Sequence, residues 1–351
     1  MAPDQWEVAL GQGGCLRIGV VYDAGSGDWD PKDVAAVLLN VRAVQRALRV
    51  GGHVTTLIPV TLGDIRWLQK VQRCDAIFNL CEGVNGIARY EDYAVAALDL
   101  TRVPFTGCNS WTVTIAHRKH IANTLFAASG VPVPPFVLAK RGTVPDGLMF
   151  PVIVKPSGED ASVGIDSGSV CTTKKALKER LAKAAGMHWE DTLVQEYVPG
   201  REVNVGFVGS EMLPISEINF QKMPAGSWPI VTYAAKWDDG SPEDLGTVPM
   251  CPAPLEPELA RKIEAVARLA WQVIGSEMGY GRVDIRITPD GRPFVLEVNP
   301  NPDISADAGL ARMARVRGWD YDTLIQKVVD EALDRAARRR VAEAQYLKVP
   351  A

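Results

Sequence analysis

The 351-residue sequence has no stretch suited to a membrane and no excess of basic charge. No uncharged run reaches the roughly 18 residues that span a bilayer, and the first residues have neither a basic segment nor the long apolar run of an export signal. Acidic residues outnumber basic ones by 42 to 38, a formal net charge of -4, which argues against a general nucleic-acid binder. We therefore expect a cytoplasmic protein with small partners, and no nucleic-acid or membrane partner.

Cysteine is sparse, and the common cysteine and glycine motifs are missing. The six cysteines form no CxxC pair and no metal-ligand spacing, and most stand beside apolar residues, so reduced, buried thiols are the simple interpretation. The glycines of "GQGGCLRIG" precede the first predicted strand, whereas a dinucleotide-binding fingerprint lies between a strand and a helix. Neither a cysteine metal site nor a Rossmann-type site is indicated.

The patterns that are present divide the chain into three regions, which we predict as domains over residues 1–107, 108–200 and 201–351. The first alternates strands and helices, as in a parallel sheet covered by helices. The second begins with one helix over residues 112–130 and continues as a small α+β unit. The third has antiparallel strands, a polar segment from Gln221 to Pro254 that we expect to be long loops, a helix, a hairpin and a helical end.

The segment "GRVDIRITPDGRPFVLEVNP" predicts a β-hairpin with charge on one face. Asp290-Gly291 suits a two-residue type I′ turn, and with Pro289 and Arg292 flanking it, facing residues have numbers that sum to 581. This register puts four polar side chains on one face: Arg282, Asp284, Glu297 and Asn299. It puts six apolar side chains on the other: Val283, Ile285, Ile287, Phe294, Leu296 and Val298.

The charged face of this hairpin is a candidate metal site. Asp284 and Glu297 stand directly opposite each other and repel. With Asn299 they offer the hard oxygen ligands that Mg²⁺ accepts, with positions left for phosphate oxygens and water. A solvated Arg-Asp-Glu ion network is the alternative from this segment alone. The rigid loop "NPNPDIS" that follows favours the cation site.

Other polar residues suit a polyphosphate or a nucleotide. Lys155 ends an apolar strand and precedes a turn that contains Ser162; an ammonium with N–H and hydroxyl donors can hold phosphate, although a strand-end lysine is usually a surface residue. Glu196, Val198 and Glu202 lie at a strand end and the turn after it, where backbone groups could bind adenine and a carboxylate could bind ribose. Surface glutamates on an edge strand are the alternative there.

Seven segments occur in a recognisable order: "IFNLCEG", "VPFTG", "HRKHIANTLFAASGVPVP", "FPVIVKPSGEDASVGI", "VQEYVPGRE", "GRVDIR" and "LEVNPNP". Together they resemble the ATP-grasp superfamily, specifically its D-alanine:D-alanine ligase-like branch, over most of the chain. The resemblance implies a three-domain α/β plus α+β fold, in which an N-terminal parallel α/β domain precedes central and C-terminal α+β lobes that clamp ATP. It also implies that a carboxylate is phosphorylated to an acylphosphate, which an amine then attacks.

Carried over by position, the resemblance implies an ATP-binding set of Lys119, Lys155, Ser162, Glu196, Val198, Glu202 and Lys236. In this set Lys119 and Lys155 would contact phosphates, and Lys236 would close over the γ-phosphate. Arg282 would face the acylphosphate and the oxyanion, so Arg282 and Lys236 are the catalytic candidates. The metal ligands Asp284, Glu297 and Asn299 would hold two Mg²⁺, or Mn²⁺. Family members are often homodimers, and we expect one here by analogy.

The chain departs from the D-alanyl ligases where those enzymes recognise substrate. Ala161 stands at a family serine and Trp237 at a family tyrosine, and "DAGSGDWDPKD" contains no glutamate, so all three members of a hydrogen-bonded triad are missing. Glu82 replaces a family histidine and Asp303 a family glycine. Glu82, Trp237 and Asp303 are therefore candidate substrate residues, and they suit a bulkier or more cationic amine than D-alanine.

Three functions follow as hypotheses. The first is an ADP-forming carboxylate-amine ligase that joins small substrates, such as amino acids or their derivatives, but does not make D-alanyl-D-alanine. The second is a regulatory or partner protein that binds ATP without ligation. The third is a phosphotransferase that releases the acylphosphate. The retained Arg282, Asp284, Glu297 and Asn299 favour the first.

Overall fold

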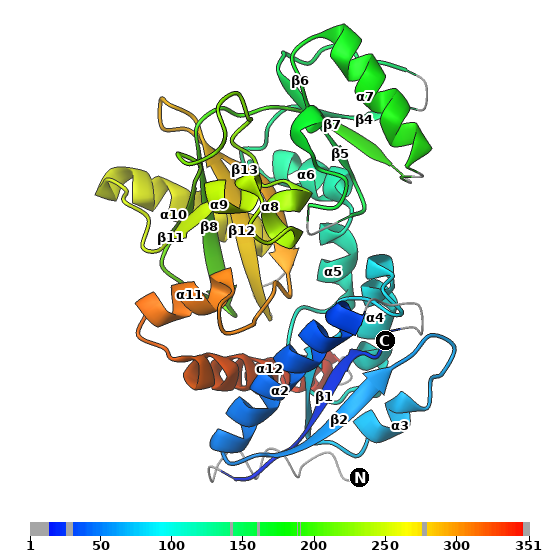
Figure 1. The fold of residues 1–351 in the computed structure, drawn as a ribbon. Coiled ribbons are helices and arrows are strands. Elements are labelled where there is room, and N and C mark those ends of the chain that lie inside the picture. Colours follow the sequence, from blue (N-terminus) through cyan, green and yellow to red (C-terminus); the bar gives the residue numbers. More distant parts are fainter. Residues whose placement is uncertain are drawn as a thin grey trace.

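A computed structural model describes residues 14–25, 31–140, 143–159, 162–187, 189, 191–275 and 279–346. Figure 1 shows a β-sheet domain holding the N-terminal part of the chain, a larger antiparallel sheet, and a small lobe that lies beyond it. None of the described helices combines the length and the apolar composition needed to cross a bilayer.

The N-terminal domain contains the expected parallel sheet. Its strands β1 (Arg17–Asp23), β2 (Val54–Val60) and β3 (Ala76–Leu80) run parallel in the order β2-β1-β3. Four of the seven residues of β1 are buried in one unbroken run, as expected for a central strand covered on both faces. The domain also contains α2 (Pro31–Val50), α3 (Trp67–Val71), the 3-10 turn η1 (Ala88–Tyr90) and α4 (Glu91–Thr101). Helix α12 (Tyr321–Tyr346) packs against α2, so the end of the chain adjoins its beginning.

The single helix expected over residues 112–130 is wrong: the chain forms α5 (Ser110–Ala116) and α6 (Lys119–Ala128). The break falls at His117 and Arg118, both of which hydrogen-bond Asp92. Arg118 has extended backbone angles, φ -117° and ψ 79°, so the α-helical backbone is interrupted. The Lys119 N–H then donates to the Ser157 carbonyl, at 2.9 Å, and α6 begins beside the loop that follows β5.

The small lobe is a four-stranded antiparallel sheet in the order β4-β7-β5-β6. Its strands are β4 (Phe136–Ala139), β5 (Val152–Pro156), β6 (Val170–Cys171) and β7 (Thr192–Glu196), with the 3-10 turn η2 (Ser167–Ser169) before β6. Helix α7 (Lys174–Gly186) packs on this sheet through Leu177, which shares a core with Val152, Val154 and Val194. These elements match the predicted α+β unit.

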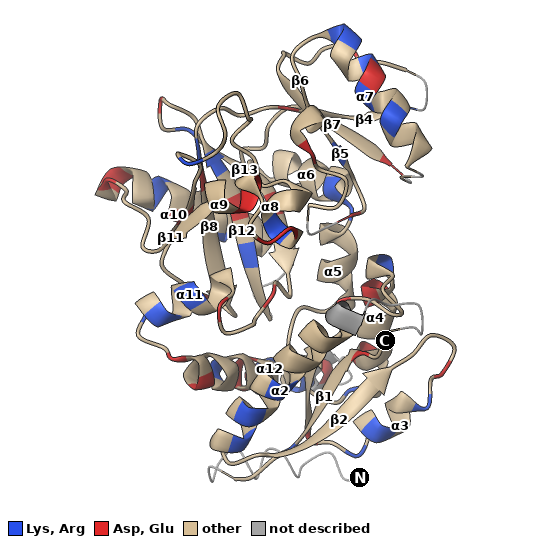
Figure 2. Cartoon of the chain, in the orientation of Figure 1, with Lys and Arg blue, Asp and Glu red and all other residues tan. Residues whose placement is uncertain are grey.

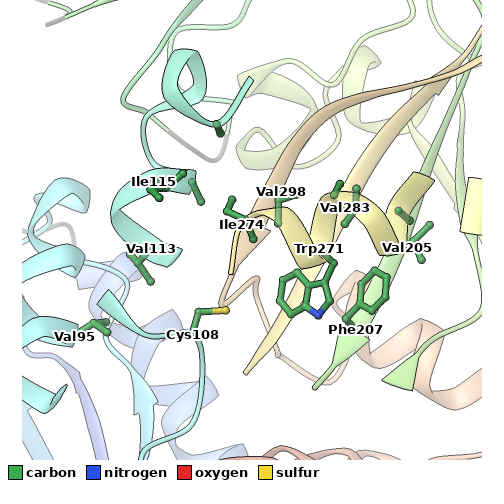
Figure 3. Packing of buried hydrophobic residues seen from close by; sticks show 14 of the residues in the cluster. Val95, Cys108, Val113, Ile115, Val205, Phe207, Trp271, Ile274, Val283 and Val298 are labelled. Atoms are coloured by element: carbon green, nitrogen blue, oxygen red, sulfur yellow. The ribbon is translucent and has the colours of Figure 1, made fainter. Parts of the chain in front are cut away.

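The larger sheet has six strands: β11-β10-β8-β12-β13, with β9 paired to β8. The strands are β8 (Arg201–Val208), β9 (Glu211–Met212), β10 (Ser216–Asn219), β11 (Val248–Met250), β12 (Tyr280–Ile287) and β13 (Pro293–Pro300). Helices α10 (Pro257–Val273) and α11 (Gly309–Val316) accompany it. Figure 3 shows Trp271 of α10 packed on Phe207, and the same core reaching Val113 of α5 and Val95 of α4. One continuous apolar cluster therefore joins this sheet to α4 and α5.

One expectation for this region and one for the cysteines of the whole chain need correction. The segment from Gln221 to Pro254 is not all loop, since it contains α8 (Tyr233–Trp237), α9 (Pro242–Gly246) and β11. Side-chain caps from Thr232 and Ser241 begin the two short helices. The cysteines are also less buried than expected: Cys81, Cys108 and Cys171 are buried, while Cys15 is exposed and Cys74 and Cys251 are partly buried.

The predicted hairpin exists, but its register changes halfway. Arg282 pairs with Asn299 and Asp284 with Glu297, as expected. An irregularity beyond Asp284 then pairs Ile285 with Val295, and the turn runs from Thr288 to Arg292 instead of closing on two residues. The apolar face is correspondingly different: Val295 is buried with Val283, Ile285, Ile287 and Val298, whereas Phe294 and Leu296 are only partly buried. A bulge of one residue accounts for this change, because it reverses the alternation of faces in β13.

Candidate active site

The charged face of β12 and β13 carries a connected set of side chains, here called the hairpin group: Arg282, Asp284, Glu297, Asn299 and Asn204. Arg282 donates through Nε and Nη2 to the two Asp284 oxygens, at 2.7 and 2.8 Å. Asn204 Nδ2 and Asn299 Nδ2 also donate to Asp284, at 2.6 and 2.8 Å. The structure thus brings together all four residues picked out by the hairpin pattern. It adds Asn204 of β8, which the sequence analysis missed.

Two buried lysines direct positive charge toward the hairpin group. Lys119 Nζ lies 3.4 Å from Glu297 Oε2 and donates to the Glu159 carbonyl, at 2.5 Å. Lys155 of β5 is 8% exposed. Burial lowers its pKa to about 8, and the Glu297 carboxylate acts in the opposite direction. Figure 2 shows basic and acidic segments together where β12 and β13 approach α6 and α8.

The donor chemistry of the hairpin group fits a hard divalent cation. Asp284 and Glu297 face each other across the two strands, and Lys119, Arg282 and Asn299 Nδ2 compensate their charge in this structure. The described residues contain no cluster of three or more His, Cys, Asp or Glu side chains that could hold a metal. A cation here would therefore share two carboxylates with the Asn299 amide oxygen and with ligand oxygens, a set that magnesium accepts.

Two of the three predicted nucleotide residues, Val198 and Glu202, bind Arg286, and the third, Glu196, does not. The Glu202 carboxylate accepts from Arg286 Nη1, at 3.0 Å, and the Val198 carbonyl accepts from Arg286 Nε, at 3.1 Å. Burial raises the pKa of Glu202, and Arg286 partly opposes that rise. The Glu196 carboxylate accepts from the Met149 N–H, at 2.8 Å, and the Glu196 N–H donates to the Pro135 carbonyl, at 2.8 Å. Arg286 therefore connects Val198 and Glu202 to β12, and the sequence analysis missed it.

A hydrogen bond joins the predicted phosphate loop to the segment just before α8, the helix that carries Lys236. Ser162 Oγ donates to the Val231 carbonyl, at 3.0 Å, just before α8. Lys236 and Trp237 both lie on α8 and are solvent-exposed, Trp237 by 59%. Ala161, which stands at a family serine, lies outside the described residues, as do residues 26–30 of the segment that lacks the family glutamate.

A second acidic set lies where the N-terminal domain meets the loop after β13, here called the Glu82 group: Glu82, Glu91 and Asp303. Glu82 retains solvent-exposed surface, yet local burial by neighbouring protein, followed by the Glu91 and Asp303 charges, raises its pKa to about 8. Asn301 Nδ2 donates to Glu91, at 2.8 Å, and its Oδ1 accepts from the Cys108 N–H, at 2.7 Å. The Glu82 group is thus tied to the hairpin strand that ends at Pro300.

Comparisons with known proteins identify the family. A family profile described as D-ala D-ala ligase C-terminus matches residues 125–330. The chain belongs to the D-alanine–D-alanine ligase family. It is 30% identical over 297 residues to the D-alanine–D-alanine ligase of Geobacter sulfurreducens, covering 83% of this chain and 87% of that protein. It is 33% identical over 305 residues to a protein of Sinorhizobium fredii named uncharacterized protein y4sG, covering 83% and 86%.

The fold agrees with this family. A crystal structure of D-alanine–D-alanine ligase from Bacillus anthracis complexed with ATP superposes with a TM-score of 0.72, at 19% identity, over 93% of this chain and 100% of that one. The ATP-grasp architecture inferred from the motifs is therefore confirmed. Membership of the ligase family makes the protein an ATP-dependent, ADP-forming carbon–nitrogen ligase.

Proposed function

We propose that the protein joins a small carboxylate to an amine through an acylphosphate and that its product is not D-alanyl-D-alanine. The observation that carries the chemistry is the hairpin group, faced by Lys119 and Lys155. It combines hard oxygen ligands, a planar cation and two ammonium groups around one strand pair. Phosphoryl transfer needs mainly positioning and charge neutralisation, and these residue types supply both.

In the proposed reaction, a substrate carboxylate oxygen attacks the γ-phosphorus of ATP and ADP departs. The amine nitrogen then attacks the acyl carbon, phosphate departs with the C–O bond electrons, and the amine loses a proton. Lys119, Lys155 and Lys236 bind phosphate oxygens. Arg282 stabilises the negative charge that develops on the acyl oxygen. Glu202 and Val198 hold ribose and adenine, and Ser162 belongs to the phosphate loop.

The metal belongs to the proposal as well. Asp284, Glu297 and Asn299 would hold Mg²⁺, in two sites, with Mn²⁺ as a substitute. The ion would supply charge neutralisation for the phosphate oxygens. In that state the carboxylates would exchange contacts with Lys119, Arg282 and Asn299 Nδ2 for the cation. The assignment is supported by the opposed register of Asp284 and Glu297 and by the oxygen-rich donor set.

The acceptor amine would carry an additional positive charge or more bulk than D-alanine. Support comes from the Glu82 group, in which the charges that shift the Glu82 pKa are both negative. An ammonium or guanidinium on the substrate would favour the ionised form of Glu82. Trp237, exposed on α8, offers an indole face for a larger side chain. The homodimer and the domain boundaries remain predictions.

A screen of amino acids and small amines for amine-dependent ADP release with Mg²⁺ tests this function. The expected result is ADP release that requires both a carboxylate and an amine, with a new amide found by mass spectrometry and a preference for basic amines. D-alanyl-D-alanine as the preferred product would contradict the substrate assignment. ADP release that continues without any amine would identify a phosphotransferase instead.

A further inference from the structure

Arg286 is a buried arginine at the junction of three chain segments. It is 2% exposed and lies on β12 two positions beyond Asp284, so its side chain emerges on the same face of that strand. Its Nε donates to the Val198 carbonyl, at 3.1 Å. Its Nη1 donates to Glu202 Oε2 and the Pro229 carbonyl, at 3.0 and 2.6 Å, and its Nη2 donates to Tyr197 Oη, at 2.8 Å.

Burying a guanidinium is costly unless its N–H groups find partners. Here a single carboxylate balances the charge, and the other three acceptors are two backbone carbonyls and a tyrosine hydroxyl. The ring of Tyr197 also lies under the guanidinium, 5.1 Å from Cζ to the ring centroid. An arginine that only paired with Glu202 would not need the further hydrogen bonds to Val198, Pro229 and Tyr197. The geometry instead fixes the positions of backbone at Val198 and Pro229.

The contact with Pro229 reaches the helix that carries Lys236. Two residues further on, the Val231 carbonyl accepts from Ser162 Oγ, at 3.0 Å. The Tyr233 N–H, at the start of α8, donates to the Ile165 carbonyl, at 2.9 Å. Residues 229–233 are therefore held by β12 on one side and by the loop after β5 on the other.

We propose that Arg286 is a positioning residue for the nucleotide. It holds the Val198 backbone and the Glu202 carboxylate in place, and it keeps residues 229–233 against the loop containing Ser162. This inference rests on the proposed ATP site at Val198 and Glu202.

The test compares Arg286→Met with Arg292→Met in the full-length protein. Arg292 lies on the same hairpin, but its side chain is 67% exposed and pairs with Asp290. Arg286→Met should weaken ATP binding about tenfold or more, because charge-assisted hydrogen bonds are lost, and should raise the KM for ATP more than it lowers kcat. Arg292→Met should leave ATP binding unchanged.

A second readout does not depend on nucleotide. Hydrogen exchange at the amides of residues 230–237 should be faster in Arg286→Met than in the wild type and in Arg292→Met. If Arg286→Met does not fold, Arg286→Lys and Tyr197→Phe take its place, with smaller losses of ATP affinity expected. Lysine keeps the positive charge but lacks the N–H groups by which the guanidinium reaches several acceptors at once. Full ATP affinity in Arg286→Lys would therefore overturn the proposal that Arg286 positions these acceptors.

The outcomes separate this inference from the proposed function. A wild type that binds ATP but forms no amide would end the ligase proposal, and the effect of Arg286→Met on binding would still decide the role of Arg286. A wild type that binds no ATP would end both the ligase proposal and the nucleotide role. Unchanged ATP affinity and unchanged exchange in a folded Arg286→Met variant would overturn the inference alone.

Discussion

The hairpin group and the Glu82 group are both rich in carboxylates, but their charges are balanced differently. In the hairpin group Asp284 accepts from Arg282, Asn204 and Asn299, and Glu297 lies 3.4 Å from Lys119 Nζ. In the Glu82 group, burial by neighbouring protein and then the negative charges of Glu91 and Asp303 raise the pKa of Glu82 to about 8.

The two groups therefore differ in how their charges are compensated before a ligand binds. The hairpin group carries cationic and amide groups that can stand in for an exchangeable metal ion, so its carboxylates are compensated in the isolated chain. In the Glu82 group, the raised pKa of Glu82 favours its protonated form until a positively charged ligand binds. The first arrangement suits a reaction centre shared with the family. The second suits a site that selects a particular amine.

The largest effect is expected when the hairpin group is disrupted. Asp284→Asn and Glu297→Gln should each lower amine-dependent ADP release by a factor of about 100 or more, since each removes a charge that neutralises and positions phosphate. Steady-state ADP release at saturating ATP measures this loss. Asp290→Asn, on the exposed tip of the same hairpin, is the control and should retain wild-type turnover. Unchanged turnover in Asp284→Asn would refute the metal assignment.

A smaller effect is expected from changing the Glu82 group. Glu82→Gln combined with Asp303→Gly should lower kcat/KM for a basic amine by about 10- to 100-fold, as expected when a charged contact is lost, and leave the KM for ATP unchanged. Turnover of basic and neutral amines, compared in parallel, measures this selectivity. Equal losses for both amines would show that these residues act on folding or chemistry and not on selection.

The Glu82 group also predicts a pH dependence of stability. The pKa of Glu82 is raised from its ordinary 4.5 to about 8 in the folded protein, so the folded state binds the proton more tightly than the unfolded state does. The contribution of Glu82 to the free energy of unfolding should therefore fall as pH rises from about 5 to 8. Urea unfolding across this range should show a flatter profile for Glu82→Gln. A profile identical to the wild type would mean that Glu82 does not titrate in this window.

Lys155 predicts a pH effect on ATP binding. Burial lowers its pKa to about 8, so the ammonium that would contact phosphate is lost as pH rises above that value. The KM for ATP should rise by up to about tenfold per pH unit between pH 8 and 9.5. A flat KM for ATP over this range would place Lys155 away from the phosphates.

The smallest expected effect concerns Ser162. Ser162→Ala removes the hydrogen bond to the Val231 carbonyl, which links the loop after β5 to α8. Because a single neutral hydrogen bond contributes about 0.5–1.5 kcal/mol, the Kd for ATP should rise only about two- to tenfold. Isothermal titration with ATP checks this. A loss as large as that of Asp284→Asn would mean that the hydroxyl binds the nucleotide directly.

Much of the hairpin group could be predicted from the sequence, because strand alternation and the Asp290-Gly291 turn set the pairing of Asp284 with Glu297. The same alternation also places Arg286 on the charged face, together with Arg282 and Asp284. Asn204 could not be found in this way, because nothing local indicates that β8 lies beside β12 with Asn204 opposite Asp284.

Other features could not be predicted because they depend on contacts between distant segments. The break between α5 and α6 depends on His117 and Arg118 binding Asp92, 25 and 26 residues earlier. The bulge after Asp284 falls beside three consecutive apolar residues of β13, Phe294, Val295 and Leu296, so the sequence pattern there does not show which of them face the core. Nothing local predicts that Glu196 bonds Met149 and Pro135 while the Val198 carbonyl bonds Arg286.

The position of α12 has a consequence for the synthesis of the protein. Leu324, Ile325 and Val328 of α12 share a core with Val20 of β1 and Leu48 of α2, and α12 begins at Tyr321, 241 residues after β3 ends at Leu80. At a translation rate of roughly 5–20 residues per second, about 12–48 seconds pass before that core can be completed. During this time the nascent chain presents an uncovered apolar face, which makes its first hundred residues a natural client for a chaperone at the ribosome.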